Sequence, residues 1–81
     1  MTTRIVYYII HCTSAENQQG VFHYSEPFTL LEDAGKLAQK YRDSFPPGEG
    51  HVAIEQHHEV YDGYAWQIDH DRGGSEHVAY L

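Results

Sequence analysis

Carboxylate and imidazole side chains, the groups that could support electrostatic binding, metal ligation or proton transfer, gather in the second half of the chain. Residues 43–81 hold eight of the 12 Asp and Glu but only one of the five Lys and Arg, namely Arg72. Residues 1–42 are balanced in charge, so the second half carries the whole net charge of −7. This asymmetry favours a partner with a basic surface and opposes direct binding of nucleic acid, which requires positive charge.

Several of these residues are predicted to share one face of a β-hairpin. Two strand-like runs, 51–61 and 64–71, flank the turn dipeptide Asp62-Gly63. One face would then carry an acidic strip made of Glu55, His57, Glu59, Asp69 and Asp71. Glu55 would lie opposite Asp69, an arrangement of like charges that destabilises a sheet and therefore suggests a use. We predict that this strip binds the partner, the alternative being a solvated face that only keeps the chain soluble.

The strip depends on the register chosen for the hairpin. A three-residue loop, Tyr61-Asp62-Gly63 with Gly63 at positive φ, would pair Val60 with Tyr64. A two-residue turn that pairs Tyr61 with Tyr64 would mix apolar and charged side chains on both faces. Burial fixes register, so the three-residue loop is predicted. The face opposite the strip would then carry Val52, Ile54, Val60, Tyr64, Trp66 and Ile68.

The second half of the chain also contains several side chains that could bind a metal ion. The side chains of zinc or nickel ligand type are His57, His58, Glu59, Asp69, His70, Asp71 and His77. His57 and His58 are adjacent, so they point to opposite faces of a strand and cannot join one site. No His-Glu-x-x-His or Cys-x-x-Cys spacing occurs. We predict no metal and no cofactor, with adventitious metal binding as the alternative.

Nucleophilic catalysis has few candidates. Cys12 lies near His11 and His23, and Ser25 lies near His23, but all are neighbours on predicted strands. A catalytic nucleophile usually sits on a strained turn beside an oriented base. The glycines fit turns rather than a phosphate-binding loop. The chain is therefore predicted not to be an enzyme, and a small metal- or Cys-dependent enzyme is kept as the third alternative.

The helices and strands that position these residues are predicted from the spacing of apolar residues and from the Gly and Pro residues that end each segment. Strands are predicted over 4–13, 21–25, 51–61, 64–71 and 77–81, a loop over 14–20, and a helix over 30–44. A capping box at Thr29 and Glu32 would start the helix. Its apolar stripe, with Trp66 from the hairpin, is the predicted core: Leu30, Ala34, Leu37 and Tyr41. We predict one α+β domain over 1–81, an antiparallel sheet of 4–5 strands with one helix on one face, in the order ββαββ(β).

The first strand is apolar on both faces, which one helix cannot cover. Either Val6, Tyr8 and Ile10 on one face, or else Ile5, Tyr7 and Ile9 on the other, need a second cover. We predict a homodimer built on the uncovered face, with Val6, Tyr8 and Ile10 as its candidate residues and the C-terminal segment 78–81 as the alternative cover. No apolar run approaches the roughly 18 residues of a membrane span, and the single Cys12 excludes an intrachain disulfide. The expected setting is cytoplasmic, without a membrane partner.

The first strand with Tyr7-Tyr8-Ile9-Ile10, a short second strand, one helix and an Asp62-Gly63 hairpin containing Trp66 together resemble small phage-encoded anti-CRISPR proteins. The resemblance is one of size and architecture, and it transfers no residue role. It implies a compact inhibitor that blocks its target by protein–protein contact. We therefore predict a small acidic protein-binding module whose carboxylates stand in for phosphates on a basic, nucleic-acid-binding surface. The alternative function is a structural homodimer.

Overall fold

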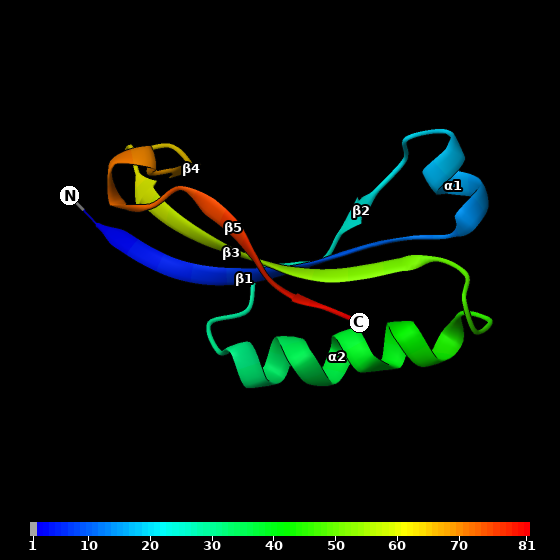
Figure 1. Cartoon of the computed structure of the whole chain (residues 1–81). Helices are drawn as coiled ribbons and strands as arrows, with labels where there is room; N and C mark the ends of the chain where they lie inside the picture. Colours follow the sequence, from blue (N-terminus) through cyan, green and yellow to red (C-terminus); the bar gives the residue numbers. More distant parts are fainter. Residues whose placement is uncertain (1) are drawn as a thin grey trace.

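The computed structural model describes residues 2–81 and has an α+β architecture, a curled antiparallel sheet with one main helix (Figure 1). This confirms the predicted fold class. The elements in chain order are β1 (Thr3–Cys12), α1 (Ser14–Gln18), β2 (His23–Tyr24), α2 (Leu31–Ser44), β3 (His51–Tyr61), β4 (Trp66–Ile68), the 3-10 helix η1 (His70–Arg72) and β5 (Ser75–Tyr80). Three of the predicted ranges were close: β1 is shifted by one residue, the main helix begins one residue later and β3 has the predicted bounds.

The pairing of β1 with β3 forms the middle of the sheet. The two strands are antiparallel over ten residue pairs, from Thr3 opposite Val60 to Cys12 opposite His51. The short strand β2 pairs with the outer edge of β1, while β4 and β5 pair with different stretches of the second edge of β3. Thus β3 has neighbours on both edges along most of its length.

Helix α2 lies against one face of the sheet (Figure 1). Beneath it, Ile9 and the strand residues Val52 and Ile54 form the buried core with Ala34 and Ala38. Both alanines have no exposed surface, which fits a helix that must approach the sheet closely. Partly buried side chains surround this core: Tyr7, Phe28, Leu37, Tyr41, Phe45, Ala79 and Leu81. The predicted core position is therefore correct for Ala34, whereas Leu37 and Tyr41 are only partly buried at the margin of the core.

The two helix starts differ from the prediction. Leu30 is the N-cap of α2, makes no side-chain cap and is 58% exposed, so the Thr29 capping box and the core position of Leu30 are wrong. The capping box lies instead at Thr13, whose hydroxyl accepts from the Glu16 amide while the Glu16 carboxylate accepts from the Thr13 amide. It starts α1 where a loop was predicted, because the two reciprocal bonds satisfy free amides of the first turn.

The hairpin after β3 has neither of the two registers considered. Tyr61 pairs with Trp66, so the loop between them has four residues. The Asp62 carboxylate closes this loop by accepting from the amides of Tyr64 and Ala65 at 2.8 and 2.9 Å. Gly63 has the predicted positive φ, 102°. The preference of an Asp side chain for backbone amides two and three residues ahead therefore overrode the apolar pattern on which the prediction was based.

The new register moves Trp66 away from the predicted core. Glu59 now pairs with Ile68, so Trp66 and Ile68 belong to the face of Glu59 rather than to the face of Val52 and Ile54. The Trp66 ring is half-buried, and the Arg4 guanidinium lies 4.1 Å from its centroid. The predicted separation of an apolar and an acidic hairpin face is therefore wrong.

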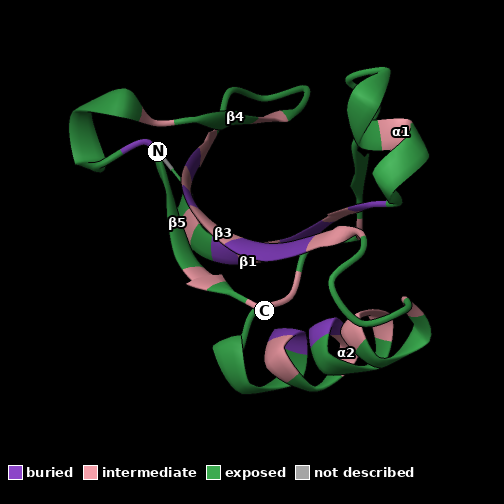
Figure 2. Ribbon diagram, turned by 45° about the vertical axis from the view of Figure 1, so that its right-hand side comes forward, coloured by how far each residue is buried: buried purple, intermediate pink, exposed green. Residues whose placement is uncertain are grey.

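The sheet face opposite α2 is covered by the chain's own curl. Figure 2 shows β3 bending so that its end and β4 rise over this face, with β2 and α1 rising at the other end. Val6 and Ile10, proposed for a dimer face, are only 1% and 4% exposed and lie in the floor of this fold. Their apolar surface is already covered, while the homodimer itself stays a prediction. Within residues 2–81, neither helix combines the length and the apolar character needed to cross a membrane.

The packing beneath α2 gives a paired stability prediction. Ile9 is completely buried, whereas Ile5, on the same face of β1, is 48% exposed. We expect Ile9→Ala to lower the free energy of unfolding by about 2–4 kcal/mol, because it leaves a cavity. Ile5→Ala removes the same atoms and should cost less than about 1 kcal/mol. Urea unfolding measures both, and equal losses would contradict the placement of the core.

Candidate functional site

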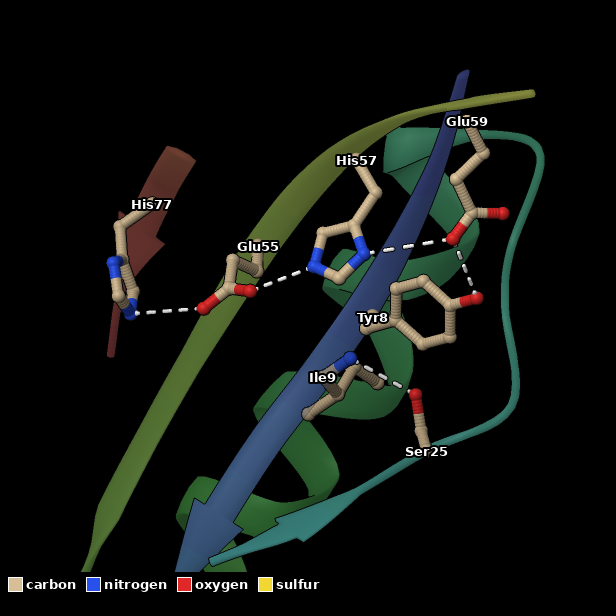
Figure 3. Close-up of polar contacts among 7 residues, drawn as sticks. All are labelled: Tyr8, Ile9, Ser25, Glu55, His57, Glu59 and His77. Atoms are coloured by element: carbon tan, nitrogen blue, oxygen red, sulfur yellow. Dashed lines mark hydrogen bonds and ion pairs between the residues drawn. The ribbon is translucent and has the colours of Figure 1, made fainter. Parts of the chain in front are cut away.

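A network of charged and polar side chains lies on the sheet face opposite α2 (Figure 3). We call it the carboxylate–histidine network, and its members are Arg4, Tyr8, Glu55, His57, Glu59 and His77. They come from β1, β3 and β5, so only the folded sheet brings them together. The network is the largest connected group of ionisable side chains in the described chain and the first candidate for a functional site.

Strand geometry explains the gathering. Glu55, His57 and Glu59 alternate along β3 and therefore point to one face. The β1 register sets Arg4 opposite Glu59. A bulge between Ile54 and Glu55 shifts β5, which then places His77 opposite Glu55.

His57 lies between the two carboxylates. Its Nε2 is 2.6 Å from Glu55 Oε1, and its Nδ1 is 3.5 Å from Glu59 Oε2. The other Glu55 oxygen, Oε2, is 3.5 Å from His77 Nε2. Figure 3 shows these side chains as one row across the strands, ending in Tyr8 at the Glu59 side. The His57 imidazole therefore bridges the two carboxylates, and His77 contacts Glu55 alone among them.

Glu59 is the buried end of the network, with 5% of its surface exposed. Its Oε1 lies 2.8 Å from both Nε and Nη2 of Arg4, and its Oε2 accepts from the Tyr8 hydroxyl at 3.1 Å. Burial, and then the hydrogen bond to Glu59, raise the pKa of Tyr8 above its ordinary value. A buried carboxylate is tolerated when a cation and hydrogen bonds compensate it, and both are present here.

Glu55 is at the open end, beside a hollow of about 230 Å³. The lining residues are Ile10, Phe22, Tyr24, His51, Glu55 and His77. Burial, and then the negative charge of Glu55, raise the pKa of Tyr24. The hollow therefore combines one carboxylate with four rings, two of which belong to Phe22 and Tyr24 on the β2 side.

A larger hollow, about 390 Å³, lies near the N-terminal end of β1. Its lining includes Arg4 and Arg72, which could suggest an anion site. Both guanidiniums are engaged, however, since Arg4 pairs with Glu59 and Arg72 Nε lies 3.2 Å from Asp69 Oδ2. The smaller hollow beside Glu55 is therefore the better candidate for a charged ligand.

The predicted acidic strip is only partly assembled. Glu55, His57 and Glu59 do share a face, but their side chains are 13%, 10% and 6% exposed and bind one another. Asp69 does not oppose Glu55: its amide donates to the carbonyl of His58, and its carboxylate pairs with Arg72. Asp71 is exposed on η1, away from the row. The four-residue loop and the 3-10 helix cause this difference, because both shift the chain after β3.

The metal and catalytic candidates are also placed. In the described residues 2–81, no three His, Cys, Asp or Glu side chains are arranged to hold a metal ion. Cys12 has no exposed surface, and burial raises the pKa of its thiol. The Ser25 hydroxyl accepts from the Ile9 amide and donates to the Glu26 carbonyl, both at 2.9 Å (Figure 3 shows the first bond). Cys12 is therefore a buried residue of β1, and Ser25 joins the segment after β2 to β1 by a hydrogen bond.

No protein-family model, curated protein or solved structure matches this chain. The site is thus described by its geometry alone. Reasoning from the sequence found Glu55, His57 and Glu59 through their alternation, but missed Arg4, His77 and Tyr24 as partners. No local signal marks these three, since the contacts are created by the pairings of β1 and β5 with β3 and of β2 with β1.

The Arg4–Glu59 pair gives a stability prediction. Arg4→Met would leave Glu59 buried beside Tyr8 without its cation, and we expect a loss on the order of 2 kcal/mol in the free energy of unfolding. This value is below that of a fully buried pair, because 29% of the Arg4 side chain is exposed. Adding Glu59→Leu should recover much of the loss. Thermal or urea unfolding measures both variants, with Arg72→Met, at a more exposed pair, as the control expected to change little.

His11 gives a prediction on pH. Its ring stacks on Tyr41 with centroids 4.3 Å apart, and burial, and then the nearby His23, lower its pKa. The unfolded chain therefore binds this proton more readily than the folded one. The neutral ring supports folding fully above the unfolded pKa, and this support is lost as pH falls below about 6.5.

His11→Phe keeps the stacking surface but cannot bind a proton. Between about pH 7.5 and pH 5.5, we expect wild type to lose more stability than this variant. Urea midpoints at the two pH values provide the measurement. The exposed His70, replaced by Gln, serves as the control, and identical pH slopes for wild type and His11→Phe would contradict the expectation.

Proposed function

We propose that the chain is a binding module for a protein with a basic surface, and that it inhibits this protein by occupying the place of nucleic acid. The observation that carries the proposal is the uneven use of charge. The cations of the chain are largely engaged by its own groups, while many carboxylates face solvent. An inhibitor of a CRISPR effector, which the architecture suggests by resemblance, would be one protein of this kind.

The engaged cations are spread over the fold. Arg4 pairs with Glu59, Arg72 with Asp69, and Lys36 with Glu32. Arg42 donates to the carbonyls of Pro46 and Glu49. Four of the five Lys and Arg are thus engaged, against 12 Asp and Glu, which supports a protein rather than a nucleic acid as the partner.

The exposed carboxylates of the second half lie outside these pairs. Glu49, Asp71 and Glu76 are exposed and form no ion pair within residues 2–81. A surface of one sign speeds the encounter with an oppositely charged partner and gives binding that salt weakens. Of the predicted partner-binding residues, Asp71 fits this role directly, whereas Glu59 and Asp69 are held by arginines.

Exposed aromatic side chains support a protein interface. Tyr64 at the tip of the β3–β4 hairpin is 94% exposed, and Tyr80 and Tyr24 are 69% and 57% exposed. Aromatic rings are enriched at the centres of interfaces, where they bury much area with little loss of side-chain entropy.

Capture from a host lysate at about 0.05 M salt, followed by elution at about 0.5 M, tests the proposal. We expect the captured protein to bind nucleic acid, and the free chain to weaken that binding at least tenfold in a mobility-shift assay. A partner that stays bound at high salt, or one whose nucleic-acid binding is unchanged, would contradict the proposed mechanism.

Two charge-matched triple variants locate the surface. Glu49→Gln, Asp71→Asn and Glu76→Gln together remove three exposed charges from the second half. Glu26→Gln, Glu32→Gln and Asp33→Asn together remove three from the first half. The association rate with the captured protein should fall severalfold for the first variant and change little for the second. Equal rates for both would show that the second half is not the binding surface.

A further inference from the structure

We propose that the hollow beside Glu55 receives an arginine side chain of the partner. This inference rests on the proposed function, because it assigns the contact that the basic partner would make at short range. We name the hollow, lined by Ile10, Phe22, Tyr24, His51, Glu55 and His77, the Glu55 pocket.

The carboxylates of the network outnumber its Lys and Arg side chains. Arg4 is the only Lys or Arg among the described members, against Glu55 and Glu59. Arg4 is bound to Glu59, at the far end from the pocket. Glu55 therefore has no Lys or Arg partner among residues 2–81, and 13% of its side chain is exposed. A largely buried charge is costly until it is paired, so a cation that reaches Glu55 is favoured.

One oxygen of Glu55 is suited to a ligand. Oε1 already takes the close contact of 2.6 Å with His57. Oε2 has a longer contact of 3.5 Å with His77 Nε2, beyond the usual length of a charge-assisted hydrogen bond. Figure 3 shows Glu55 between the two imidazoles, with these oxygens directed to different sides. A guanidinium N–H could therefore bind Oε2 without displacing His57.

The walls of the pocket favour a planar cation. Phe22 and His51 meet edge to face with centroids 5.7 Å apart, and the His77 ring stacks with Tyr80 at 5.2 Å. Phe22 and Tyr24 are 42% and 57% exposed, so part of each ring is accessible. Guanidinium stacks on aromatic faces and is more weakly hydrated than ammonium, and therefore arginine fits this lining better than lysine.

The test uses the full chain and N-acetyl-arginine methylamide, a probe whose only charge is the guanidinium. We expect NMR shifts confined to the pocket residues and to Tyr80 and His57 beside them. Glu55→Gln should weaken binding at least tenfold, and Glu76→Gln, which removes an exposed charge on β5, less than twofold.

A second pair of variants keeps the test valid if Glu55→Gln disturbs the fold. Tyr24→Leu removes an exposed pocket ring, whereas Tyr64→Leu removes an exposed ring at the hairpin tip. Only Tyr24→Leu should weaken binding of the probe. Equal effects within either pair, shifts spread over the surface, or equal binding of N-acetyl-lysine methylamide would overturn the assignment.

Failure of this inference and failure of the proposed function are distinguishable. If a basic partner is captured in a salt-sensitive manner but Glu55→Gln binds it as wild type does, the arginine contact at the Glu55 pocket is contradicted and the proposed function is retained. If the arginine probe binds at Glu55 but no basic protein is captured, the proposed function is contradicted and the Glu55 pocket is retained as an arginine site.

Discussion

The long antiparallel ladder between β1 and β3 is the interaction on which the rest of this structure depends. It joins residues near the start of the chain to residues some fifty positions later, and it fixes both faces of the sheet together. On one face it sets Ile9 beside Ile54 beneath α2, and on the other it sets Arg4 beside Glu59. A shift of one residue would exchange the faces, moving Ile9 away from α2 and separating the buried carboxylate from its cation.

The two faces are buried by different means. Helix α2 covers one with small side chains, Ala34 and Ala38, whereas the other is covered by the curl of the sheet itself. A chain of 81 residues has little material for a second layer. The curl supplies cover but not a purely apolar core, so Glu59 and His57 are buried with partners from neighbouring strands. This polar interior makes the face chemically distinctive while adding little net stability.

Local sequence patterns predicted the three longest elements, β1, α2 and β3, well, and the segments that connect them poorly. The apolar periodicity gave the range of α2 and the β-forming run gave β3, because both signals lie within one segment. Thr13 and Thr29 each precede a Glu by three residues, yet only Thr13 forms the capping box. Phe28 pairs with Tyr7 of β1 just before α2, and the helix takes Leu30, one residue beyond Thr29, as its N-cap. This long-range pairing is not visible in the local sequence. The Asp62 turn likewise decided the hairpin register through side-chain bonds that apolar alternation does not record.

The same limit explains why the sequence predicted the amount of negative charge correctly but not its position on the surface. The chain concentrates its carboxylates in the second half, but Glu59 pairs with Arg4 and Asp69 pairs with Arg72. The negative potential at the surface is therefore weaker than the number of carboxylates implies. In the proposed function, the remaining carboxylates divide into two groups by the distance over which they would act. Exposed groups such as Glu76 would act at a distance, where they speed encounter and respond to salt. Glu55 lies inside a partly aromatic lining and would act only at contact, where geometry rather than net charge selects the ligand. A surface that separates these tasks can attract many basic proteins while retaining few, since selectivity then depends on one correctly placed cation.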